Sequence, residues 1–158
     1  MRRRHADDGA IAGLEALAFG ALIFVGGTLL IVNAWGVVDA KVAVSAAARE
    51  ATRAFVESPA QATVEQAEVR AREAAHLTMA GHGSGRVALV DVRMQGAFPG
   101  RGLVRCAEVT STVTTSVPSL FIPFVGVLRQ GGFEVRASYT EVVDPFRSGL
   151  DAGGICAL

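Results

Sequence analysis

Residues 10–38 read AIAGLEALAFGALIFVGGTLLIVNAWGVV, and this stretch decides how the chain is organised. Glu15 is its only ionisable side chain, and the remaining residues are nearly all Ile, Leu, Val, Phe, Ala and Gly. A bilayer core is crossed by about 20 apolar residues in a helix, and this stretch is longer. The surface helix of a soluble domain would carry a polar face, which these residues lack. The sequence therefore predicts a membrane-spanning helix over residues 10–38.

Glu15 is the informative residue of this span. A carboxylate within a membrane-spanning segment is costly and usually has a function. Glu15 lies about one helical turn inside the end of the span that follows the leader, residues 1–9. Two interpretations are open at this point. Its carboxylate either reaches the membrane surface and does nothing further, or pairs with a positive charge of another protein.

The leader supports the second interpretation. Arg2-Arg3-Arg4 is followed by Asp7-Asp8-Gly9 and then by the small-residue apolar helix with one Glu near its start. This arrangement resembles the class III signal of type IV pilin-like proteins. More narrowly, it is similar to the TadE-like minor pseudopilins of tight-adherence (Flp) pilus systems, in the form seen in actinobacteria. The later stretch Tyr139–Arg147, YTEVVDPFR, resembles the end of the sheet in those proteins.

The resemblance implies a role in pilus assembly. A membrane prepilin peptidase would cut after Gly9, and Ala10 would become the new N-terminus. Glu15 would then attract the free N-terminus of a neighbouring pilin or pseudopilin subunit. Counted from Ala10, Glu15 is the sixth residue, whereas the acid of the family is the fifth. The chain would be a minor pseudopilin that acts by packing its helix in a Flp-type pilus or secretion assembly.

The orientation follows from the tight arginine cluster of the leader, which favours an N-terminus in the cytoplasm and residues beyond about 38 outside. Two other functions remain open. The chain could be a membrane-anchored extracytoplasmic interaction module that enters no filament. It could also be a secreted domain that signal peptidase releases after Ala34 or Ala40. The apolar stretch exceeds the 7–15 residues of a signal h-region, which favours an anchor in the cell membrane.

Beyond the span, residues 39–57 are rich in Ala and contain no helix breaker before Pro59. One continuous helix is predicted over residues 13–57, with its second half outside the membrane against a head domain of residues 58–158. A second, amphipathic helix is predicted to begin at Ser58-Pro59-Ala60-Gln61, with Ser58 as the cap and Gln61 completing a capping box. Its predicted apolar face consists of Val64, Ala67, Ala71, Ala74 and Thr78.

From Arg86 the hydrophobic pattern changes to a period of two, which is typical of half-buried strands. Strands are predicted over residues 86–95, 104–117 and 133–143. The third is expected to point Phe133, Val135, Ala137 and Tyr139 inward. The predicted fold class is therefore α+β, with a long transmembrane and stalk helix, a second helix and a small antiparallel sheet of about three strands.

The segment Leu120–Leu128, LFIPFVGVL, is too apolar for an ordinary surface loop. It is predicted to be either a lid over an open face of the sheet or a docking surface for another subunit or the membrane. Phe121, Ile122 and Phe124 are the candidate docking residues.

Cys106 and Cys156 are the only cysteines, and both follow the span. In an oxidising compartment they are predicted to form one disulfide that ties the C-terminal tail to the second strand. The alternative is a pair of buried thiols.

Enzymatic activity is not expected from this sequence. The three histidines and two cysteines show no metal-ligand spacing, and there is no nucleophile elbow or phosphate-binding loop. We therefore expect no metal, no cofactor and no small-molecule substrate. The formal net charge is zero and the arginines beyond the leader are scattered, so nucleic acid is not an expected partner. The expected partners are membrane lipid and other pilin subunits.

Overall fold

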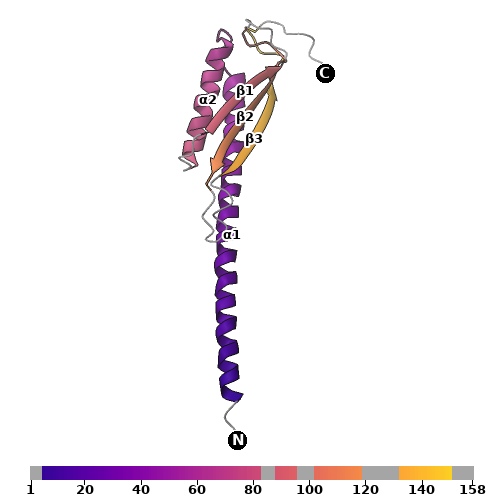
Figure 1. Ribbon diagram of the computed structural model, residues 1–158. Coiled ribbons are helices and arrows are strands. Elements are labelled where there is room, and N and C mark those ends of the chain that lie inside the picture. Colours follow the sequence, from indigo (N-terminus) through magenta and orange to yellow (C-terminus); the bar gives the residue numbers. More distant parts are fainter. Residues whose placement is uncertain (1–4, 83–87, 96–101, 119–131, 151–158) are drawn as a thin grey trace.

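The computed structural model describes residues 5–82, 88–95, 102–118 and 132–150 of the chain. The fold is α+β, as the sequence predicts, and consists of a long helix, a second helix and a three-stranded antiparallel sheet (Figure 1). The long helix projects far beyond the head that the other elements form. The elements, in chain order, are α1 (His5–Val56), α2 (Val64–Gly81), β1 (Ala88–Gln95), β2 (Glu108–Val117) and β3 (Phe133–Val142).

The sheet has the strand order β1-β2-β3, and both pairs are antiparallel. Alternate residues of β2 are buried against α1, among them Val109 and Val113. The opposite face of β2 and β3 is polar because it carries Thr and Ser side chains. Their hydroxyls pair across the two strands. The Thr110 and Thr140 Oγ1 atoms are 2.8 Å apart, and Thr112 Oγ1 is 2.9 Å from Ser138 Oγ. One face of the sheet thus makes the core and the other meets water.

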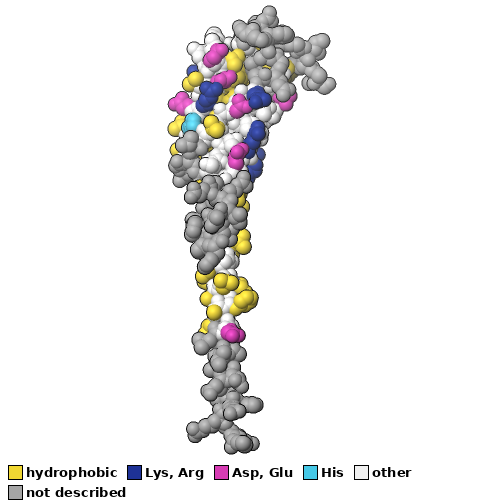
Figure 2. Space-filling view, viewed as in Figure 1, with side chains coloured by type: hydrophobic (Ala, Val, Ile, Leu, Met, Phe, Trp, Pro, Cys, Tyr) yellow, Lys and Arg dark blue, Asp and Glu magenta, His cyan; other side chains and the backbone are white. Residues whose placement is uncertain are grey.

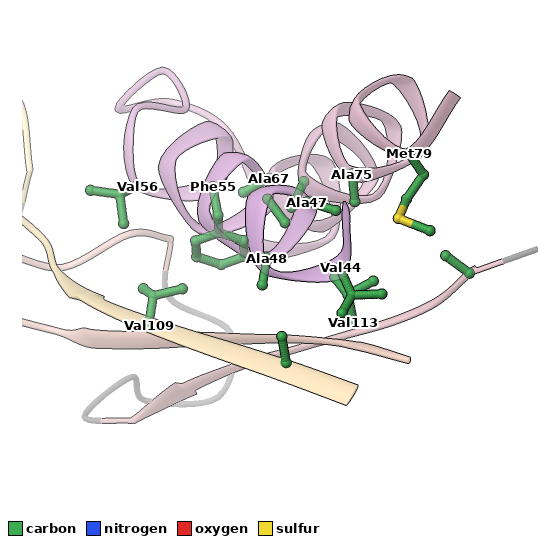
Figure 3. Close-up of a cluster of buried hydrophobic side chains, with 14 of the residues drawn as sticks. Val44, Ala47, Ala48, Phe55, Val56, Ala67, Ala75, Met79, Val109 and Val113 are labelled. Atoms are coloured by element: carbon green, nitrogen blue, oxygen red, sulfur yellow. The ribbon is translucent and has the colours of Figure 1, made fainter. Parts of the chain in front are cut away.

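The second half of α1 is the centre of the hydrophobic core (Figure 3). It contacts α2 on one side and β2 and β3 on the other. Small side chains line the two helices where they meet, so the backbones can approach closely. The large side chains Phe55 and Val44 are buried with the valines of the sheet. The alanines that are fully buried in the two helices are Ala40, Ala43, Ala47, Ala48 and Ala51 of α1 and Ala67, Ala71 and Ala75 of α2.

The second helix begins later than its sequence predicts. Its N-cap is Thr63, whose hydroxyl accepts from the Gln66 N–H at 3.3 Å, while the Thr63 N–H donates to Gln66 Oε1 at 3.1 Å. The predicted cap, Ser58, is buried, and its hydroxyl donates to the Ala54 carbonyl at 2.8 Å. The prediction was wrong because the chain carries two capping-box patterns, and the hydroxyl of the first cap, Ser58, is bonded back to the last turn of α1.

The third strand is only partly covered. Val135 and Ala137 are buried as predicted, but Phe133 is 50% exposed and Tyr139 37% exposed. Both were expected to point into the core. β3 is an edge strand, and α1 covers its middle more completely than its ends. Tyr139 instead lies beneath the guanidinium of Arg49, whose Cζ is 5.4 Å from the ring centroid.

The second strand begins at Glu108 and not at Val104, where the sequence predicts it. Just before it, Cys106 has a φ of 62°, in the left-handed region. The N–H of Cys106 donates to the Val143 carbonyl, and the N–H of Val143 donates to the Ala107 carbonyl. Two residues therefore face one across the sheet, as in a β-bulge, and the bulge ends the regular ladder.

Arg147 joins the end of the sheet to the end of α1. Its guanidinium donates to the carbonyls of Val56 and Ser58, at the C-terminus of the helix. These carbonyls have no partner within the helix, and a cation is also favourable there because of the helix dipole.

Arg147→Ala is expected to lower the free energy of unfolding by about 2–3 kcal/mol, since it removes charge-assisted hydrogen bonds from partly buried carbonyls. Arg147→Lys keeps the charge but lacks the planar fork, and should recover part of that loss. Thermal unfolding of the full chain in detergent measures both. An alanine variant within about 0.5 kcal/mol of the native protein would show that the contact has no stabilising role.

Candidate functional site

The part of α1 between Glu15 and Val38, its apolar half, is an exposed apolar surface. No residue between Glu15 and Val38 is buried, and Ala40 is the first buried residue from Glu15 onward. Figure 2 shows hydrophobic side chains around the projecting part of the helix, whereas charged side chains of both signs lie over the head. In the part of the chain that the structure describes, one helix, α1, is both long enough and apolar enough to cross a membrane.

The polar side chains of this surface are satisfied within the helix. The Thr28 hydroxyl donates to the Phe24 carbonyl, and the Asn33 amide donates to the Leu29 carbonyl, both at 2.8 Å. An apolar medium penalises polar groups without a hydrogen-bond partner, so these local bonds suit the segment to lipid.

Glu15 differs from these polar residues because it carries a charge. Its side chain is exposed, and no basic side chain among the described residues pairs with it. The next ionisable residue along the helix is Asp39. Any basic partner of the Glu15 carboxylate therefore lies outside the described residues.

Three glycines of the apolar half leave open space on its surface. A Cβ built on Gly20, Gly26 or Gly27 would meet no atom within 4 Å. The backbone at these positions is accessible to a second helix, because no side chain of the same chain covers it.

Some of the other predicted site residues are described by the structure, and some lie outside the described residues. Gly9 and Ala10 lie within the backbone of α1. Cys106 is disulfide-bonded, while Cys156 lies outside the described residues. Phe121, Ile122 and Phe124 also lie outside them, so the docking surface that they were expected to form stays a prediction.

The charged groups of the head form local surface pairs. The Arg53 pKa is raised by its hydrogen bond to the Glu57 carboxylate, with Nε and Oε1 2.9 Å apart. The Glu65 pKa is lowered by hydrogen bonds from its own backbone N–H and from Thr63 at the start of α2. Among the described residues, no group of three His, Cys, Asp or Glu side chains is placed to hold a metal ion.

No protein-family model, no curated protein and no solved structure matches this chain. Its function is therefore inferred from the exposed apolar helix and from the head that is built on the same helix.

Sequence patterns did not reveal how the sheet is held beside the helix. Lys41 Nζ donates to the Arg136 carbonyl. Val117 Cγ1 lies against the backbone of Gly36, 3.6 Å from the place that a Cβ would occupy if this glycine had one. Both contacts join residues that are far apart in the sequence. They place one end of the sheet directly beside the end of the apolar surface.

Proposed function

We propose that this chain is a TadE-like minor pseudopilin, anchored by α1 with its N-terminus in the cytoplasm and its head outside. It assembles with other pilin or pseudopilin subunits in a Flp-type pilus or secretion system. One observation carries the proposal: a single unbroken helix is exposed and apolar in its first half and is the core of an α+β head in its second half.

The length of the apolar surface suits a bilayer. At about 1.5 Å per residue, the helix between Glu15 and Trp35 is about 30 Å long, which equals the hydrocarbon thickness. Trp35 then lies at the outer interface, where its amphipathic ring is favoured. Glu15 lies at the inner interface, within reach of the cytoplasmic surface.

Assembly in lipid would depend on close packing between helices. Burial of apolar side chains contributes little to helix association in lipid, because lipid tails are as apolar as the side chains. Small residues let backbones approach and gain dispersion energy. Gly20, Gly26 and Gly27, which have open space in front of them, offer such a surface to the helix of a neighbouring subunit.

The Glu15 carboxylate would set the register of this packing. A prepilin peptidase that cuts after Gly9 leaves an α-amino group on Ala10, and this group of one subunit would pair with Glu15 of the next. A charge pair near the membrane interface is less screened than one in water. A subunit out of register leaves both charges unpaired, which disfavours that arrangement.

The test is Glu15→Leu in cells that also express the pilin subunits. Glu15→Leu is expected to stay in the membrane fraction but to co-purify with the pilins about tenfold less, since a polar pair in lipid is worth about 1–2 kcal/mol. Glu15→Gln should behave like the leucine variant, because it lacks the charge. Glu15→Asp keeps the charge and is the matched control. The intact mass of the captured native protein should correspond to a start at Ala10.

Co-purification of Glu15→Leu at the native level would contradict the pairing. A native protein that stays in the membrane with Met1 intact and captures no pilin would instead be an anchored interaction module. A water-soluble protein that starts after Ala34 or Ala40 would be a secreted domain, and the pilus proposal would be wrong.

A further inference from the structure

The base of the head, defined as the end of the sheet where β2 stops and β3 starts, adjoins the apolar surface of α1. Val117, the last residue of β2, pairs with Phe133, the first of β3. Val117 also contacts α1 at Gly36, one residue beyond Trp35. Figure 1 shows these strand ends beside the middle of α1. No stalk therefore separates the sheet from the part of the helix that could cross a membrane.

Apolar side chains remain exposed at this base. Trp35 is 73% exposed, Val38 57%, Val42 56% and Phe133 50%. The helix from Trp35 to Val42 is about 10 Å long, which is more than the headgroup layer of about 5–7 Å on each side of a bilayer. If Trp35 lies at the hydrocarbon boundary, the exposed side chains of the base therefore extend through the headgroup layer.

The charges at the base are balanced. Asp39 and Glu134 are exposed there, and so are Lys41 and Arg136. The formal charges of these four residues sum to zero, so this described part of the base does not require anionic lipid. Aromatic and aliphatic side chains are the groups that enter an uncharged lipid interface favourably.

We infer that Trp35, Val38, Val42 and Phe133 form a second lipid-binding surface, which holds the base of the head in the interface of the bilayer that α1 crosses. The occupant is the boundary between headgroups and acyl chains of that same bilayer. The inference rests on the membrane anchor of the proposed function and does not require the pilus. Continuity with the apolar surface of α1 favours lipid over a protein partner, and the balanced charges of the described residues let that lipid be zwitterionic.

The experiment places a single tryptophan at the base of the head. In a Trp35→Phe background, Phe133→Trp reports on the base. Phe146→Trp is the matched control, because Phe146 is 90% exposed and follows the opposite end of β3. Each full-length variant is reconstituted in zwitterionic phosphatidylcholine vesicles, with and without bromine at carbons 6 and 7 of the acyl chains. The native protein, with Trp35 as its only tryptophan, is measured in parallel.

The tryptophan at position 133 is expected to emit at shorter wavelength than the one at position 146. Brominated lipid should quench it at least half as strongly as it quenches native Trp35, and should leave the tryptophan at position 146 unquenched. Quenching of Trp35 without quenching at position 133 would overturn the inference while leaving the anchor intact. Absence of quenching at Trp35 would overturn the anchor as well. A blue shift at position 133 that grows with the protein-to-lipid ratio, without quenching, would show that a second copy covers the base.

Discussion

The double substitution Leu22→Arg and Val25→Arg is expected to remove the protein from the membrane fraction. Both side chains are exposed near the middle of the apolar half of α1. An arginine at the centre of a spanning helix costs about 2.5–3.5 kcal/mol on insertion scales, so two of them cost about 5–7 kcal/mol. Partition into the membrane should fall by more than about a thousandfold. Alkaline carbonate extraction of cell membranes measures the fraction that remains embedded.

The matched control places the same substitutions on the head. Val69 and Leu77 of α2 are exposed to a similar degree, so Val69→Arg and Leu77→Arg change composition and charge equally. This control should remain in the membrane fraction like the native chain. If the control is lost as well, the Leu22 and Val25 result reports on expression or aggregation. If both proteins resist extraction, the apolar half of α1 is not what holds the chain in the membrane.

Phe55→Ala is expected to lower the free energy of unfolding by about 3–5 kcal/mol. Phe55 is 1% exposed and is one of the largest side chains buried between α1 and the sheet (Figure 3). Its truncation leaves a cavity that the surrounding alanines are too small to fill. A head of this size has a stability of about 5–15 kcal/mol, so the variant should unfold at a much lower temperature. Thermal unfolding followed by circular dichroism in detergent measures the shift.

Leu89→Ala is the control for this substitution. Leu89 is on β1 and is 76% exposed, so its truncation to alanine removes a large apolar side chain without opening a cavity. Its effect should stay within about 0.5 kcal/mol. Equal losses for Phe55→Ala and Leu89→Ala would contradict the arrangement of the core around α1.

Local periodicity made most of the fold predictable. The apolar helix was predictable because nearly every residue from Ala10 to Val38 is apolar. The three strands were predictable because side chains alternate along them, and the structure confirms an antiparallel sheet with three strands. The end of the second helix at Gly81 was predictable as well, because Gly81, Gly83 and Gly85 follow one another closely there.

The features that could not be predicted depend on distant contacts. Ser58 and Thr63 both match a helix cap, and only the course of α1 decides between them. The exposure of Phe133 depends on how much of an edge strand the helix covers, which periodicity does not specify. Arg147 contacts Val56 across 91 positions of sequence, and no local pattern indicates that contact.

The candidate site was predictable in composition but not in layout. The sequence identified the apolar helix and singled out Glu15 as its one charged residue. It did not show that the sheet begins beside Gly36, since that contact needs the packing of Val117 on α1. How close the sheet lies to the apolar part of α1 therefore follows only from the three-dimensional structure.

The continuity of α1 has a mechanical consequence. The helix runs for 52 residues, about 78 Å, with no proline between its two halves. A pull on the head is therefore transmitted along one continuous helical rod. Any tilt of the lower part of the rod swings the upper part through the same angle, so neighbouring rods that lean together would turn their heads in concert.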